Sequence, residues 1–96
     1  MENHLVISAF ISEAKPMRYT PAGLPALDMR IEHVSRMTES GQERDVKVDI
    51  KAVAIGSVAE RLAGQEIGSQ WRFTGFLASP RSARTVVFHV QDFQQV

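Results

Sequence analysis

Few side chains in this sequence have the type and spacing that catalysis or metal binding requires. The chain contains no cysteine, which excludes disulfides and thiolate metal ligands. His4, His33 and His89 lie far apart along the chain, and none has a second ligand at metal-binding spacing. The serines have no neighbouring base arrangement, and no glycine-rich phosphate loop is present. We therefore expect a protein that is not an enzyme and that holds no metal or other cofactor.

The basic side chains offer a different chemistry, the binding of phosphate groups. Lys and Arg number 11, as do Asp and Glu, so the formal net charge is zero. This balance argues against a strong non-specific polyanion binder, which usually has a basic excess, but it permits a local basic patch. Four basic residues with few acidic neighbours fall in segments that we predict to be loops: Lys15, Arg18, Arg81 and Arg84.

The elements that must position these side chains are β-strands, because apolar side chains recur at every second position along most of the chain. Four segments show this period-two pattern, and a fifth is rich in β-branched and aromatic residues. Turn signals separate them, namely TPAGLP after the first strand, TESGQE after the second and SPRSA after the fourth. The predicted strands cover residues 5–12, 27–32, 46–52, 71–77 and 85–93.

One segment, SVAERLAG, predicts a helix between the third and fourth strands. Ser57 is expected to cap it, Val58, Arg61 and Leu62 to share a face, and Gly64 to end it. The order β-β-β-α-β-β is that of an OB-fold, an all-β, five-stranded Greek-key barrel with a short helix between strands three and four. The competing architectures are an SH3-like barrel, which normally lacks a helix at this point, and a small open sandwich.

The length predicts the number of domains, and the N-terminal segment predicts where the protein resides. The 96 residues indicate a single domain, residues 1–96. The apolar run within residues 1–12 follows Glu2, lacks a basic n-region and is shorter than the ~20 residues that span a bilayer. We therefore expect a cytoplasmic protein that does not enter a membrane.

Five stretches of the chain resemble the primosomal replication protein N family, PriB, which is related to bacterial single-stranded DNA-binding protein. The P-x-G-x-P turn and the following "hydrophobic-E-H" strand end are the most specific of the shared features. The resemblance implies a homodimer of OB-folds that binds single-stranded DNA, contacts the restart helicase PriA and works with the helicase-loading machinery at stalled forks. The matching stretches are NHLVISAF (3–10), TPAGLPALDMRIEHVS (20–35), VAIGSVAERL (53–62), IGSQWRFTGFLAS (67–79) and VVFHVQDFQQV (86–96).

The resemblance also implies where DNA would bind. In OB-folds the nucleic acid lies in a groove lined by the second and third strands and by the loops after strands one and four. The family's basic positions correspond to Arg18 in the first loop and to Arg81 and Arg84 in the last. Two further basic residues lie at the start of the third strand, and one aromatic residue lies beside Arg18. The predicted DNA-binding residues are Arg18, Tyr19, Arg44, Lys47, Arg81 and Arg84.

Three positions depart from the family pattern. Well-studied members place aromatic residues near the positions of Gln42 and Lys47, and a basic residue at the position of Val34. Because stacking on an aromatic side chain contributes about 1–3 kcal/mol per base, the departures predict weak binding of single-stranded DNA. The alternative function is that of a protein-interaction adaptor of the primosome whose DNA groove is vestigial.

The first strand has two expected properties. It must bend to take part in both halves of the barrel, and either Ser8-Ala9 or Ser12-Glu13-Ala14 could permit this. The stretch HLVISAFI is apolar on both faces, so a free edge there would promote aggregation. Pairing with the same strand of a second copy would remove that edge, which predicts a homodimer. The alternative is that the barrel itself covers both faces.

The remaining aromatic, methionine and histidine side chains are expected to be structural. Trp71 shares its parity with Phe73, which predicts packing in the core or at the barrel end. Phe10 and Phe76 could stack on bases, but core or dimer packing is the favoured expectation for both, and a structural hydrogen bond is expected for His33. The methionines expected to fill gaps between apolar residues are Met17, Met29 and Met37.

Overall fold

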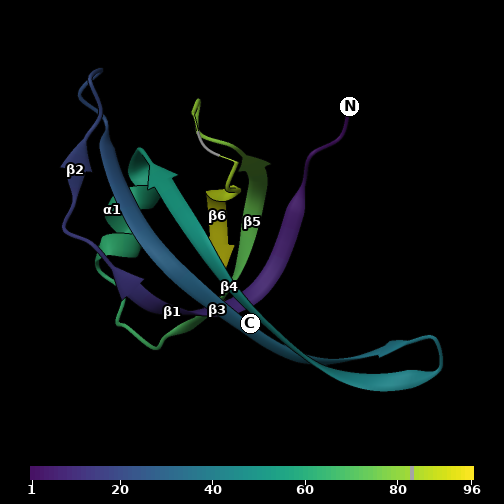
Figure 1. Ribbon diagram of the computed structural model, residues 1–96. Coiled ribbons are helices and arrows are strands. Elements are labelled where there is room, and N and C mark those ends of the chain that lie inside the picture. The colour runs from purple at the N-terminus through teal and green to yellow at the C-terminus, as the bar shows by residue number, and fades with distance from the viewer. Residues whose placement is uncertain (83) are drawn as a thin grey trace.

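The computed structural model describes residues 1–82 and 84–96. Figure 1 shows a curved sheet that closes on itself, with one helix at its side. The elements are β1 (Leu5–Ala14), β2 (Arg18–Tyr19), β3 (Pro25–Glu39), β4 (Gln42–Ile55), α1 (Ser57–Ala63), β5 (Gln70–Ala78) and β6 (Val87–Gln94).

The strands form a closed barrel. Their order is β1-β5-β6-β4-β3, and β1 also pairs with β3, so that five strands complete the circle. The pairing of β4 with β6 is parallel, whereas the other pairings are antiparallel. The very short β2 adds to β3 outside the circle. All five predicted strands are therefore confirmed, as is the closed barrel expected of an OB-fold, while β2 is an additional strand.

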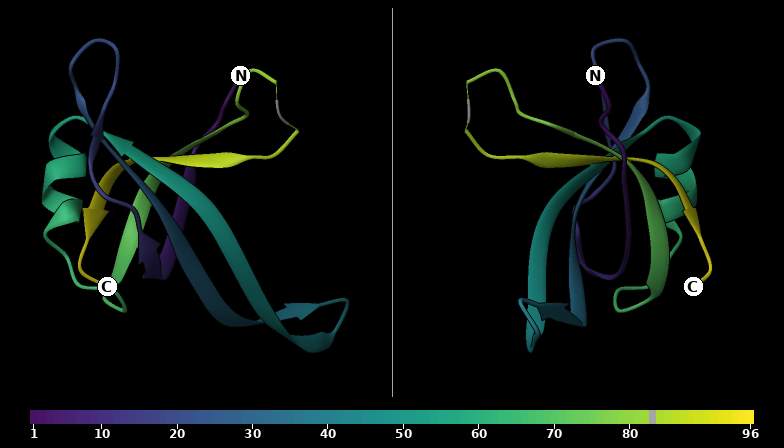
Figure 2. Two further views of the ribbon diagram at one scale, coloured as in Figure 1. Left: turned by 60° about the vertical axis from the view of Figure 1, so that its left-hand side comes forward. Right: turned by 90° about the vertical axis from the view of Figure 1, so that its right-hand side faces the viewer.

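The helix follows the third of the five barrel strands and packs against β3 and β4 at one side of the barrel (Figure 2). It buries Val58 and Leu62, whereas Arg61, which was predicted to share their face, remains exposed. The prediction that Ser57 caps the helix is wrong: Gly56 occupies the N-cap position with a φ of 89°, and no side chain caps the helix. A positive φ is readily adopted only by glycine, which explains Gly56 at this sharp junction between strand and helix.

The barrel interior is filled by apolar side chains from most of its elements. The largest fully buried side chains are Phe73, Phe88, Ile11, Ile31 and Leu62. Trp71 packs against this core and meets the ring of Phe93 edge-on, with 5.0 Å between the ring centroids. The prediction for Trp71 is thus confirmed. Phe10 and Phe76 are only partly buried and lie outside the core cluster, so core packing does not account for them.

One glycine is required by the close approach of two strands. A Cβ atom on Gly75 would lie 1.8 Å from the carbonyl oxygen of His89 in β6. The register of β5 and β6 shifts at this point, between Thr74 and Gly75. A bulge of this kind sharpens the local twist, which a small barrel needs in order to close.

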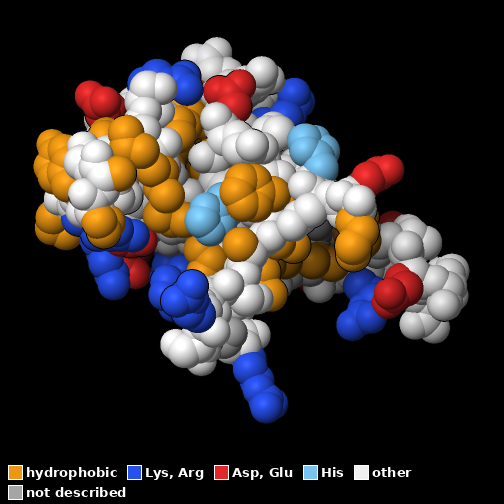
Figure 3. Space-filling view, turned by 90° about the horizontal axis from the view of Figure 1, so that it is seen from above, with side chains coloured by type: hydrophobic (Ala, Val, Ile, Leu, Met, Phe, Trp, Pro, Cys, Tyr) orange, Lys and Arg blue, Asp and Glu red, His pale blue; other side chains and the backbone are white. Residues whose placement is uncertain are grey.

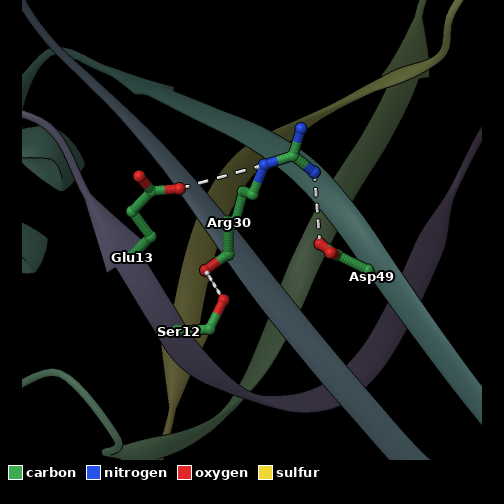
Figure 4. A network of polar contacts seen from close by, with 4 residues as sticks. All are labelled: Ser12, Glu13, Arg30 and Asp49. Carbon is green, nitrogen blue, oxygen red and sulfur yellow. Dashed lines mark hydrogen bonds and ion pairs between the residues drawn. The ribbon is translucent and has the colours of Figure 1, made fainter.

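β1 bends at the second of the two predicted places. Its first part, Leu5–Phe10, pairs with β5, and its last part, from Phe10 to Ala14, pairs with β3. The register with β3 shifts between Ile11 and Glu13, so Ser12 is the bulged residue. Figure 4 shows the hydroxyl group of Ser12 donating a hydrogen bond of 3.1 Å to the carbonyl oxygen of Arg30.

The same close view shows how β1, β3 and β4 are tied together on the outer surface. The side chain of Arg30 reaches toward Glu13 at 3.9 Å and toward Asp49 at 3.2 Å (Figure 4). Exposed ion pairs of this kind contribute little to stability, typically about 0–1 kcal/mol each. Their consequence here is electrostatic, because they leave this part of the outer surface with no excess of positive charge.

β3 and β4 are much longer than predicted and form an arm that projects from the barrel (Figures 1 and 2). The strand does not end at His33, so the predicted strand end there is wrong. The arm, residues 34–47, closes at Ser40 and Gly41, whose positive φ values of 51° and 76° suit a tight hairpin turn. With no core beneath it, the arm leaves Met37 57% exposed, which contradicts the predicted gap-filling role. Met17 and Met29 do pack in or against the core.

The last strand and the turn before it lie close to their predicted positions. The last strand begins at Val87 and not at residue 85. The turn predicted at residues 79–83 lies in the connection between β5 and β6, although residue 83 is outside the described residues. In the part of the chain that the structure describes, no helix is long and apolar enough to cross a membrane.

Candidate nucleic-acid interface

A groove of about 340 Å³ lies on the outer face of the barrel, between β2 and the connection from β5 to β6. The floor of the groove is formed by two strands. β4 contributes its alternate residues Lys51, Val53 and Ile55, and the neighbouring β6 contributes Val87 and His89. One wall comes from β2 and β3, and the other from the first residues after β5. The lining residues are Arg18, Asp28, Lys51, Val53, Ile55, Ala78, Ser79, Pro80, Val87 and His89.

The local sequence explains how Arg18 reaches the groove. The Thr20 hydroxyl accepts a hydrogen bond from the amide of Leu24, and the Thr20 carbonyl accepts one from Gly23, whose φ is 84°. This tight turn folds β2 back along β3, with Arg18 opposite Ala26. The TPAGLP segment is therefore the turn that the sequence predicts, and it places Arg18 beside the groove.

Arg18 is held by an acidic residue within the groove. Its Nε donates to Asp28 Oδ2 at 2.6 Å and its terminal nitrogen donates to Asp28 Oδ1 at 3.1 Å. These hydrogen bonds lower the pKa of the Asp28 carboxyl below its ordinary value, against the opposing effect of partial burial. The positive charges of Arg18, Lys15 and Lys51 lower the pKa of Asp28 as well. Asp28 is therefore ionised at neutral pH and neutralises the cation that faces the groove.

The other predicted residues divide into two groups. Arg81 and Arg84 are exposed in the connection whose first residues, Ser79 and Pro80, form a wall of the groove. Arg44 and Lys47 lie on the arm, where Arg44 pairs with Glu39 and Lys47 is exposed opposite Val34. The structure thus brings Arg18, Arg81 and Arg84 to the same end of the barrel and places Arg44 and Lys47 elsewhere.

Tyr19 is 69% exposed and follows Arg18 in the same short strand. Successive residues of a strand point to opposite sides. Because Arg18 turns toward Asp28, the ring of Tyr19 projects from the other side of this ribbon and does not line the groove.

Sequence reasoning missed two side chains at the groove, Lys51 and His89, and it favoured core or dimer packing over stacking for their neighbour Phe76. Lys51 and His89 line the groove, and the ring of Phe76 stacks on that of His89 with 4.9 Å between centroids and 9° between planes. Seen from above, hydrophobic and histidine side chains gather near the middle of this face, with Lys and Arg side chains around them (Figure 3). The alternation of the strand predicts the direction of Phe76: Phe73 and Gly75 face inward, so Phe76 must face outward.

His33 has a structural role. The carbonyl oxygen of Ser8 accepts a hydrogen bond of 2.6 Å from His33 Nδ1, and His33 Nε2 accepts one of 2.8 Å from the Ser35 hydroxyl. The carbonyl can only accept, which fixes the proton on Nδ1. The predicted structural hydrogen bond of His33 is confirmed. Among the described residues, no cluster of three or more His, Asp or Glu side chains could hold a metal ion.

Comparison with known proteins assigns the family. The chain is 40% identical over 95 residues to the replication restart protein PriB of Bordetella pertussis, covering 98% of this chain and 89% of that protein. This chain belongs to the PriB family. Residues 3–92 also match a family described as "another single-strand binding protein family".

Solved structures agree with this assignment to the PriB family. PriB from Ralstonia solanacearum superposes with a TM-score of 0.90 at 30% identity, over 99% of this chain and 98% of that one. The wild-type single-stranded DNA-binding protein from Thermus aquaticus superposes with a TM-score of 0.77 at 25% identity, over 99% of this chain and 50% of that protein. The barrel, its helix and the projecting arm therefore belong to an architecture shared by PriB and single-stranded DNA-binding proteins, the OB-fold.

Proposed function

We propose that this protein is a primosome accessory that acts in the restart of stalled replication forks. In this proposal its groove binds single-stranded DNA weakly, and the protein stimulates a PriA-type helicase by linking it to the DNA. The role is one of binding and not of catalysis, in the cytoplasm with the replication machinery. The relatives named replication restart protein PriB support the restart role, and the similarity to a single-stranded DNA-binding protein supports the ligand.

The observation that carries the proposal is the position of the groove. It lies between β2 and the β5–β6 connection, and both of these segments supply arginines at the same end of the barrel. Arg81 and Arg84 would contact phosphates directly, while Arg18 would do so after exchanging Asp28 for a phosphate oxygen. Beyond Lys51, its cross-strand neighbour Arg30 is flanked by Glu13 and Asp49, which disfavour a phosphate path across that surface.

A salt series with a fluorescent single-stranded oligonucleotide tests the proposal. Each phosphate contact should contribute about −0.7 to the slope of log affinity against log salt. Arg81→Ala and Arg84→Ala should each weaken binding and flatten the slope by roughly one contact. Arg36→Ala is the matched control, because Arg36 is exposed but lies on the arm between Glu43 and Asp45. An affinity that is independent of salt and unchanged in both groove variants would exclude the DNA-binding role.

The proposal includes a homodimer formed through the first part of β1. Both backbone groups of Ile11 bond on the β5 side, so the alternation of the strand directs those of Val6 and the amide of Ser8 toward the other edge. The Ser8 carbonyl already accepts a hydrogen bond from His33. Pairing with β3 begins only at Phe10, and Val6 is 50% exposed. A second copy pairing along this edge would satisfy these groups and cover the apolar side chains.

Sedimentation of the wild-type chain and of Val6→Lys tests the dimer. The wild type should sediment as a dimer at micromolar concentration, and Val6→Lys should shift it toward the 10.7 kDa monomer. Val34→Lys is the control, since Val34 is an exposed strand valine on the arm. A wild-type monomer at micromolar concentration would refute the dimer without bearing on the groove.

The second candidate function is a primosome adaptor with little direct binding of DNA. Two of the predicted cations favour it, because Arg18 pairs with Asp28 and Arg44 pairs with Glu39. The absence of aromatic side chains at Gln42 and Lys47 favours it as well. The two functions share the fold and the proposed dimer, and the salt series above separates them.

A further inference from the structure

The outer face of β5 and β6 carries an aromatic stack that the core does not need. Phe76 and His89 lie directly opposite each other in this ladder, so their rings project from the same face. The rings are nearly parallel, with 4.9 Å between centroids. Both side chains are only partly exposed, and neither belongs to the core cluster.

The stack lies where two hollows meet. His89 lines the groove described above, beside Arg18 and Lys51. Together with Phe76 it also lines a second hollow, which Ser57 and Arg61 of α1 border on the far side. The two hollows share Val53, Ile55 and His89, so they form one continuous surface across the end of the barrel.

Cationic side chains border the stack on both sides. Arg18 and Lys51 lie in the groove, and Arg61 borders the second hollow. Two of these cations have acidic partners, since Arg18 binds Asp28 and Arg61 lies 3.6 Å from Asp92. Lys51 is exposed. An apolar surface flanked by cations suits a ligand that combines flat rings with phosphates, which is the chemistry of a single-stranded nucleic acid.

We propose that the Phe76–His89 stack is the base-stacking platform of the groove, on which one nucleobase of a single strand packs. The proposal rests on the proposed function, and it identifies which part of the surface holds bases and which part holds phosphates. The platform takes the role of the aromatic side chains that are missing at Gln42 and Lys47. It also moves base contact from the arm to the end of the barrel, next to Arg18.

Because stacking is worth about 1–3 kcal/mol per base, Phe76→Leu should weaken binding about 5- to 150-fold. The slope of log affinity against log salt should remain that of the wild type, because no phosphate contact is lost. Phe76→Tyr retains a ring at this position and should bind within about twofold of the wild type. Phe10→Leu is the matched control, since Phe10 is a partly buried phenylalanine of β1 that lies outside the core cluster and lines neither hollow.

An abasic single strand of equal length provides the decisive comparison. The wild type should bind the abasic strand more weakly than the normal strand, and Phe76→Leu should cause no further loss with the abasic strand. Equal binding of the normal strand by Phe76→Leu and wild type, while Arg81→Ala still flattens the salt slope, would overturn the platform and leave the proposed function standing. If the wild type binds neither strand at low salt, both the platform and the DNA-binding role are wrong.

Discussion

Asp28 should limit the affinity of the groove for single-stranded DNA, and Asp28→Asn should raise it. In the present structure the guanidinium of Arg18 directs two donors at the Asp28 carboxylate, at 2.6 and 3.1 Å. A phosphate that binds Arg18 must displace this carboxylate and must also approach its negative charge. Asn has a similar size but no charge, so the substitution removes both obstacles.

The magnitude follows from charge and geometry. Removing one negative charge about 5 Å from a phosphate is worth about 0.8 kcal/mol in water, which is roughly a fourfold gain in affinity. Wild-type Arg18 makes its phosphate contact only when it leaves Asp28, so its release should make that contact more frequent and steepen the salt slope by up to about 0.7. The cost to stability should be small, because the pair is partly exposed, at 53% for Arg18 and 25% for Asp28. Pairs of this kind contribute about 0.2–1 kcal/mol.

Fluorescence anisotropy of a labelled single strand, measured over a salt series, is the assay. Asp28→Asn should bind about 4- to 10-fold more tightly at low salt. Asp45→Asn is the matched control, since Asp45 is an exposed acidic partner of Arg36 on the arm, away from the groove. In addition, Arg18→Ala should cost more affinity in the Asp28→Asn background than in the wild type. If Asp28→Asn binds no better than wild type, or if Asp45→Asn gives an equal gain, the reasoning fails.

Two further predictions concern stability. The lowered pKa of Asp28 means that its contribution to the free energy of unfolding is fully present above its unfolded value of 3.8 and is lost as the pH falls through the folded value. Urea unfolding of wild type and Asp28→Asn should therefore differ at pH 7 and converge on acidification below about pH 4, and a constant difference would contradict the assignment. Gly75→Ala should destabilise the fold by about 3 kcal/mol or more, because the new Cβ would overlap the carbonyl oxygen of His89 in β6. Gly64→Ala is its control, since a Cβ there meets its nearest atom at 3.7 Å, and equal denaturation midpoints for both variants would show that the crossing of β5 and β6 can relax.

The sequence predicts the strands well where one face of the strand is buried. Leu27, Met29 and Ile31 alternate with polar residues because the core lies under one face of β3. Beyond His33 the strand continues into the arm, where neither face meets the core, and the alternation that predicts strands disappears. The length of the arm is therefore determined by cross-strand pairing and by the Ser40–Gly41 turn, and not by burial.

The candidate site is predictable only in part, since its key contacts join residues that are distant in sequence. The basic character of Arg18, Arg81 and Arg84 is visible in the chain, but the carboxylate that holds Arg18 follows only from how β2 folds back on β3. Parity predicts that Phe76 points outward from β5. The identity of its partner depends on the register between β5 and β6, which a shift at Thr74 and Gly75 alters. Registers and bulges are properties of the closed barrel, so local patterns do not reveal them.

The central claim is that this barrel links single-stranded DNA to a restart helicase. Its most direct test is a titration of a purified PriA-type helicase with this protein, in which unwinding of forked DNA and of a fork without a single-stranded arm are measured side by side. The account predicts stimulation that saturates with added protein, is strongest on the fork with a single-stranded arm and is reduced by Arg81→Ala together with Arg84→Ala. Unwinding rates that do not change at any protein concentration would contradict the account.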